Sequence, residues 1–164
     1  MATQDVLHIL TWWFGITIIG SIFFPFTSLL FSRFFDKGYI FAKIIGIIVL
    51  SYSLFLVGIF HMLPFSRLLI FAFIGIFLFG PALTKHLTKK TYLPSIKNTF
   101  SFFNNNWRIV IFEECLFLGG IFFWAFIRSF EPSIHGLEKY MDYGFINSIL
   151  RSDYLPPKDM WLTP

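Results

Sequence analysis

Two carboxylates four residues apart, Glu138 and Asp142, are the side chains in this sequence best placed to do chemistry. On a helix, that spacing puts both acids on one face. The same face carries four apolar residues, Met141, Phe145, Ile146 and Ile149. Acids within an apolar stripe are expected to point into a half-buried site, where a carboxylate can act as a general base or hold a divalent cation. The alternative is local ion pairing with Lys139, Arg128 or Arg151.

The rest of the chain is too apolar to be a water-soluble globule that presents this segment. Hydrophobic residues make up 56% of the 164 residues and charged residues only 13%, against roughly 25% charged in soluble domains. We therefore expect a lipid bilayer as solvent and partner. The basic residues stand at the ends of apolar runs rather than clustering on one face, so no nucleic-acid partner is expected. The single cysteine, Cys115, excludes an intrachain disulfide.

Long apolar runs are the elements that must position the acids. A membrane-spanning helix needs about 20 apolar residues. Four runs meet or approach this length, at about 6–31, 39–63, 68–83 and 107–130. The basic stretch from Lys85 to Arg108, broken by Asn104-Asn105-Asn106, is expected to be an interfacial or looped connector. We predict an all-α, polytopic integral membrane protein with four transmembrane helices, followed over 131–164 by an outer loop segment with a short amphipathic helix.

The charges of the connectors predict an orientation in the cell membrane. Arg33 and Lys37 follow the first run, and several lysines follow the third. Positively charged loops stay on the cytoplasmic side. The N-terminus and the segment 131–164 are therefore expected to be extracytoplasmic.

Three ionisable residues fall inside the expected spans: Lys43, Glu113 and Glu114. Counted from Lys37 and from Arg108, all three lie roughly 7–9 Å inside the same membrane face, at about 1.5 Å of rise per residue. Because a charge inside a membrane is normally paired or functional, we expect Lys43 to pair with one of the two glutamates. The alternative interpretations are snorkelling of each side chain to the headgroups and a proton or ion relay.

The stretch LEKYMDYGFINSILRSDYLPPKDMWL resembles the signature of the YYY membrane protein family, polytopic proteins of bacteria and archaea. DKGYIFAKIIGIIVLSY and EECLFLGGIFFWAFIRSFEPSIHG resemble the same family. Its members are longer, and the tyrosine triplet that names them would follow shortly after MWLTP. The resemblance therefore implies an N-terminal fragment whose partners include the remaining spans of the full-length chain.

The YYY family is in turn similar to the GT-C membrane glycosyltransferases, which use lipid-phosphate-linked sugars. That similarity implies a polyprenyl-phosphate sugar as substrate and an acidic residue on a helix at the membrane surface as general base or metal ligand. Carried over in chain order, it makes Asp142 the catalytic candidate and Glu138 its partner. The candidates for substrate binding are Arg151, Asp159 and Trp161, with Arg151 as a phosphate contact. The cofactor is unknown, with a divalent cation as the candidate.

Two other function classes fit the same sequence. A transporter or channel component would use Lys43, Glu113 and Glu114 as a pathway through the membrane. A non-catalytic membrane scaffold would need neither acidic set, provided that the helices still packed.

Overall fold

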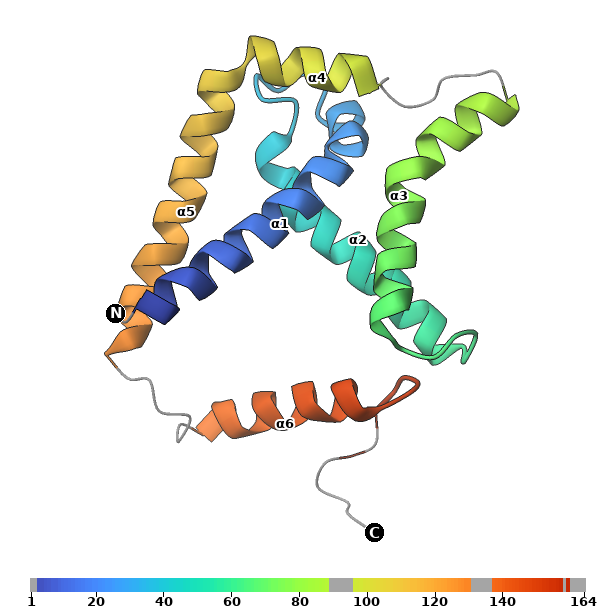
Figure 1. Cartoon of the computed structure of the whole chain (residues 1–164), viewed down its shortest axis with the longest axis vertical. Coiled ribbons are helices and arrows are strands. Elements are labelled where there is room, and N and C mark those ends of the chain that lie inside the picture. Colours follow the sequence, from blue (N-terminus) through green and yellow to red (C-terminus); the bar gives the residue numbers. More distant parts are fainter. Residues whose placement is uncertain (1–2, 89–95, 131–136, 158, 160–164) are drawn as a thin grey trace.

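The computed structural model describes residues 3–88, 96–130, 137–157 and 159, and within these residues the chain forms helices and no strand. The helices are α1 (Thr3–Leu30), α2 (Tyr39–Ile59), α3 (Arg67–Thr88), α4 (Ile96–Asn105), α5 (Trp107–Ser129) and α6 (Leu137–Arg151). Figure 1 shows α1, α2, α3 and α5 as the body of the molecule, with α4 and α6 lying across its two ends.

Three of the described helices, α1, α2 and α5, are long and apolar enough to cross a membrane, and α3 contributes a shorter apolar segment, Arg67–Gly80. Helices suit this environment because their backbone hydrogen bonds are satisfied internally. The prediction of an all-α, polytopic membrane protein is confirmed. The third expected span, 68–83, coincides with the shorter apolar segment.

α1 and α2 pack against each other more extensively than any other pair of described helices. Glycines at the crossing allow this close approach. A Cβ atom on Gly20 would lie 2.7 Å from Lys43 Cγ, and one on Gly46 would lie 2.8 Å from Ile19 Cγ2. Small residues commonly let membrane helices approach in this way. The crossing sets Lys43 of α2 directly against the backbone of α1.

The two ends of the bundle differ in what covers them. α4 lies at the end where α1 finishes and α5 begins, and α6 lies at the end where α1 begins and α5 finishes (Figure 1). At the α4 end, the Phe24 and Phe102 ring centroids are 4.8 Å apart, and Lys37 Nζ lies 5.6 Å from the Phe102 ring centroid. The basic connector after α1 and the helix α4 therefore share one face, opposite α6.

Several boundaries differ from the sequence-based expectation. α3 continues beyond Gly80-Pro81 to Thr88, and part of the stretch expected as an interfacial or looped connector is helix α4. The expected break at the three asparagines is present, because α4 ends at Asn105 and α5 begins at Trp107. Pro25 lies inside α1, which continues to Leu30. Asp36, which is 2% exposed, accepts the backbone N–H groups of Gly38 and Ile40 and so starts α2.

Candidate functional site

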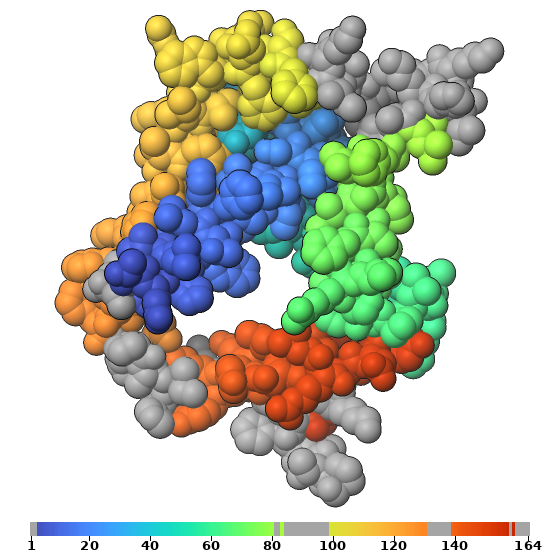
Figure 2. Space-filling view, viewed as in Figure 1, coloured from blue at the N-terminus to red at the C-terminus, as the bar shows by residue number. Residues whose placement is uncertain are grey.

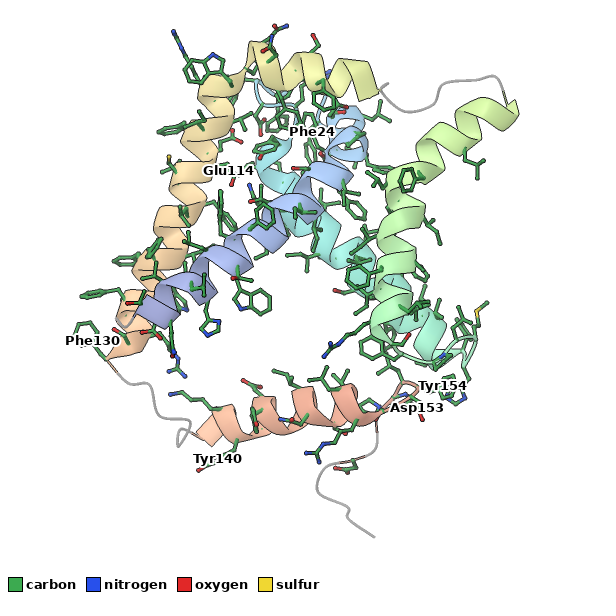
Figure 3. The ribbon with its side chains drawn as sticks, viewed as in Figure 1. Phe24, Glu114, Phe130, Tyr140, Asp153 and Tyr154 are labelled. Carbon is green, nitrogen blue, oxygen red and sulfur yellow. The ribbon has the colours of Figure 1, made fainter. Side chains whose placement is uncertain are left out.

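A polar cluster inside the bundle is centred on Glu114 of α5, which points toward α1 and α2 (Figure 3). Its Oε2 atom accepts hydrogen bonds from Trp13 Nε1 at 2.9 Å and Thr17 Oγ1 at 3.1 Å. Its Oε1 atom accepts one from the Tyr39 hydroxyl at 2.6 Å and forms an ion pair with Lys43 Nζ. One carboxylate therefore joins three membrane-spanning helices.

Lys43 is held from several sides in this cluster. The residue is only 5% exposed, and its Nζ atom lies 4.7 Å from the Tyr39 ring centroid and 4.9 Å from that of Phe117. Of the two glutamates expected as partners, Glu114 is the one that contacts it. A buried ion pair with this many further contacts suits a packing role, because each charge is compensated where it lies.

Glu113 occupies a different position from its neighbour. It is 5% exposed, and no donor among the described residues reaches its Oε2 atom. It lines a groove of about 340 Å³ between α5 and the start of α2, together with Arg108 and with apolar residues such as Phe112. The sequence reasoning treated the two glutamates as equivalent, and the structure separates them.

α6 carries the acid expected to be catalytic. Asp142 is exposed on this helix, so the expected half-buried setting is not provided by the described part of the chain. Tyr140, on the same helix, points away from the bundle (Figure 3). Asp142 follows it by two residues, or about 200° of rotation, and so faces the bundle. Figure 2 shows an opening bounded by α1, α3 and α6.

The other predicted site residues are placed as follows. The Glu138 side chain and Trp161 lie outside what the structure describes. Arg151 is exposed at the end of α6, and Asp159 is exposed beyond it. Arg151 follows Asp142 by nine residues, which on a helix is about 13 Å along the axis and about 180° round it. The described residues include no group of three or more His, Cys, Asp or Glu side chains that could hold a metal ion.

A docking segment, Ser152–Leu155, holds the end of α6 against the turn between α2 and α3. The Leu155 backbone N–H donates to the Gly58 carbonyl at 3.3 Å, and the Phe65 N–H donates to the Asp153 carbonyl at 2.6 Å. The side chain of Leu155 packs on Gly58, whose added Cβ would lie 3.1 Å away. The rings of His61 and Tyr154 are 4.8 Å apart.

Comparison with known families places this arrangement in context. The family described as "Uncharacterized membrane protein (DUF2298)" matches residues 49–163, which contain α3 to α6, the last part of α2 and the docking segment. The chain belongs to the DUF2298 family. No curated protein and no solved structure matches it. Both sides of the contact between Gly58 and Leu155 fall inside the DUF2298 match, whereas Lys43 lies before its start.

The docking segment was missed by the sequence reasoning. Two of its contacts are backbone hydrogen bonds, which carry little information about residue type, and they join positions about 90 to 100 apart in the sequence. The pair Pro156-Pro157, which follows the segment directly, stiffens the backbone but does not indicate what the segment packs on. In this DUF2298 chain, α6 is therefore held at its C-terminal end through a contact with no sequence signal.

Proposed function

We propose that this DUF2298 protein takes part in glycosyl transfer from a lipid-phosphate-linked sugar, with Asp142 as the general base. One observation carries the proposal: α6 lies across one end of the helix bundle, beside an opening bounded by α1, α3 and α6 (Figure 2). Because Tyr140 points away from the bundle (Figure 3), the spacing of about 200° turns Asp142 toward it. A substrate whose lipid tail lies in the bilayer and whose sugar lies at the surface would meet Asp142 at that level. The resemblance to the YYY family and the GT-C enzymes supports the same assignment by analogy.

The reaction needs one proton transfer and one displacement. A hydroxyl oxygen of the acceptor attacks the anomeric carbon of the donor sugar while Asp142 takes the hydroxyl proton. The bond between the anomeric carbon and the phosphate oxygen breaks, and the lipid phosphate leaves with the electron pair. General-base help of this kind contributes about 10²–10⁴-fold in rate, or roughly 3–5 kcal/mol of barrier.

The other candidates fill supporting roles in this proposal. From its spacing in the sequence, we take Glu138, one helical turn before Asp142, as the partner carboxylate, because two such acids offer the oxygen ligands that a divalent cation prefers. Arg151 lies on the far side of α6 from Asp142, so the proposal puts Asp142 and not Arg151 at the reacting centre. Asp159 and Trp161 remain candidates for binding the substrate beyond the docking segment.

The proposed orientation puts α6 and the N-terminus outside the cell membrane. It is supported by the arrangement of the connectors, because Lys37 lies beside α4 at the face opposite α6 and basic loops stay in the cytoplasm. This orientation requires α3 to complete a fourth crossing, with Arg67–Gly80 as its apolar part.

The experiment is sugar transfer by the full-length protein, reconstituted in vesicles with a polyprenyl-phosphate sugar and a hydroxyl acceptor. Asp142→Asn keeps the shape but removes the base, so its rate is expected to fall by about 10²–10⁴-fold, with membrane insertion unchanged. Asp153→Asn removes a nearby exposed carboxylate and should leave the rate intact. Full activity in Asp142→Asn would exclude the assigned role.

The alternative of a transporter or channel component has less support. A pathway needs ionisable groups that face a common water-filled space and exchange partners. Glu114 instead accepts from Trp13 and Thr17 and is paired with Lys43, which favours helix packing. Ion or solute flux across reconstituted vesicles that stops in Glu114→Gln and persists in Asp142→Asn would favour the transporter over the glycosyltransferase.

A further inference from the structure

α5 is the least covered of the described membrane-spanning helices. Only 6% of its most apolar stretch is buried, against 17% for α1 and 28% for α2, and Glu113 is its one buried residue. Large side chains such as Phe112 (63% exposed) and Trp124 (68% exposed) project from it. An acid as the sole buried residue of a membrane helix indicates that something else packs against α5.

A shallow, open groove made of two adjoining pockets, which share Leu116, follows α5 from Arg108 to Arg128. Its first stretch is lined by Arg108, Phe112, Glu113 and Leu116, with Phe35 and Ile40 across from them. A second stretch, of about 520 Å³, continues from Leu116 through Gly120 and Trp124 to Arg128. From Arg108 to Arg128 a helix rises about 30 Å, which matches the thickness of the hydrocarbon core of a bilayer.

The length of the groove decides what kind of molecule fits it. An acyl chain from one leaflet reaches only about half of the roughly 30 Å core, whereas a transmembrane helix crosses all of it. Gly120 lies in the middle, and a Cβ atom added there would meet nothing within 4 Å. A glycine facing open space lets a second helix backbone approach closely.

The charges around the groove specify the chemistry of that helix. Glu113 Oε2 is buried without a donor from the described residues. Arg108 lines the same groove, but its guanidinium lies over the Trp107 ring, 5.5 Å from the centroid. Lys43, the cation nearest in depth, is already paired with Glu114. An uncompensated acid inside a membrane is expensive, so the occupant must bring a positive charge or a strong donor to this level.

We propose that the α5 groove is the docking surface for a transmembrane helix from outside residues 1–164 that carries a Lys or Arg side chain at the level of Glu113. That level is about 7 Å inside the α4 face, since Glu113 follows Arg108 by five residues at about 1.5 Å each. A second copy of the described chain does not meet the requirement, because its own intramembrane lysine, Lys43, is engaged in the ion pair.

The test uses the chain in phosphatidylcholine vesicles, with a donor fluorophore at its N-terminus and a synthetic Leu-Ala transmembrane peptide carrying an acceptor. One peptide has a single Lys about five residues inside its end, and its companion has Leu there. The Lys peptide is expected to bind about tenfold more tightly, as for a hydrogen-bonded contact between membrane helices.

Three variants locate the contact. Glu113→Gln should abolish the preference for the Lys peptide. In Gly120→Leu the new side chain enters open space in the chain itself, so this variant should fold but bind both peptides more weakly. It keeps the test informative if Glu113→Gln fails to fold. Asp153→Asn removes a carboxylate at the other end of the bundle and should change the binding of neither peptide.

Three results would overturn the proposal. Equal binding of the two peptides by the unmodified chain would remove the role of the basic side chain. Energy transfer between differently labelled copies that exceeds transfer to the peptide would assign the groove to a second copy. Undiminished quenching of tryptophan fluorescence by brominated lipids in the presence of the peptide would show that lipid fills the groove.

Discussion

Lys43 of α2 and Glu114 of α5 form a buried ion pair that joins two membrane-spanning helices far apart in the sequence, with side chains 6% and 14% exposed. Trp13 and Thr17 bring α1 to the same carboxylate. The cluster therefore joins the three helices α1, α2 and α5 to one another.

Removing one member of this pair should destabilise the bundle. Lys43→Met leaves the Glu114 carboxylate buried without its cation, and breaking such a pair costs about 3–5 kcal/mol. The combined change Lys43→Met and Glu114→Leu should recover a large part of that loss, because no uncompensated charge remains. The free energy of unfolding in mixed micelles measures both. If the effects of Lys43→Met and of Glu114→Leu, each measured alone, simply add up in the double variant, the two residues do not interact.

A methyl group at Gly20 should separate α1 from α2. A Cβ there would lie 2.7 Å from Lys43 Cγ and 3.3 Å from Lys43 Cα, so Gly20→Ala is expected to cost about 1–3 kcal/mol of unfolding free energy. Gly15, on the same helix, has nothing within 4 Å of an added Cβ. Gly15→Ala is therefore expected to be neutral or to stabilise by up to about 1 kcal/mol. Equal effects of the two changes would argue against the close crossing.

The docking segment should detach when Gly58 is enlarged. A Cβ at Gly58 would lie 3.1 Å from Leu155 Cδ1, and valine adds further methyl groups toward the same side chain. In Gly58→Val, hydrogen exchange at the Leu155 and Phe65 amides is expected to speed up by roughly tenfold or more, from overpacking of about 1–3 kcal/mol. Gly75→Val, where an added Cβ meets nothing within 4 Å, is the matched control. Unchanged protection in Gly58→Val would mean that this contact does not hold α6.

The sequence was sufficient to predict the helical class because apolar runs of bilayer length and basic connectors follow directly from the physics of the membrane. Residue counts also predicted that Lys43 pairs with one of the two glutamates, and Lys43 contacts Glu114. Which glutamate contacts Lys43 did not follow from the counts, because neighbouring residues on a helix differ by about 100° in direction. The structure shows that α5 turns Glu114, and not Glu113, toward Lys43 and Tyr39 of α2.

The setting of α6 was less predictable. A helical wheel shows that Glu138 and Asp142 share a face, but not what that face meets. The structure leaves Asp142 exposed, where the pattern of neighbouring apolar residues predicted a half-buried site. Those apolar residues, Phe145 (45% exposed) and Ile146 (56% exposed) among them, also lie uncovered by the described chain. The sequence pattern shows that this face of α6 is apolar, but it does not show which residues pack against the face.

The side of the membrane on which α6 lies is the most direct test of the account. In a Cys115→Ser background, Tyr143→Cys places a thiol at an exposed position of α6 (59%) and Phe100→Cys places one on α4 (72%). A membrane-impermeant maleimide added to intact cells is expected to label Tyr143→Cys at once, and Phe100→Cys only after permeabilisation. Labelling of both thiols from the same side would contradict the arrangement of α4 and α6 on opposite faces, and with it the proposed outer site.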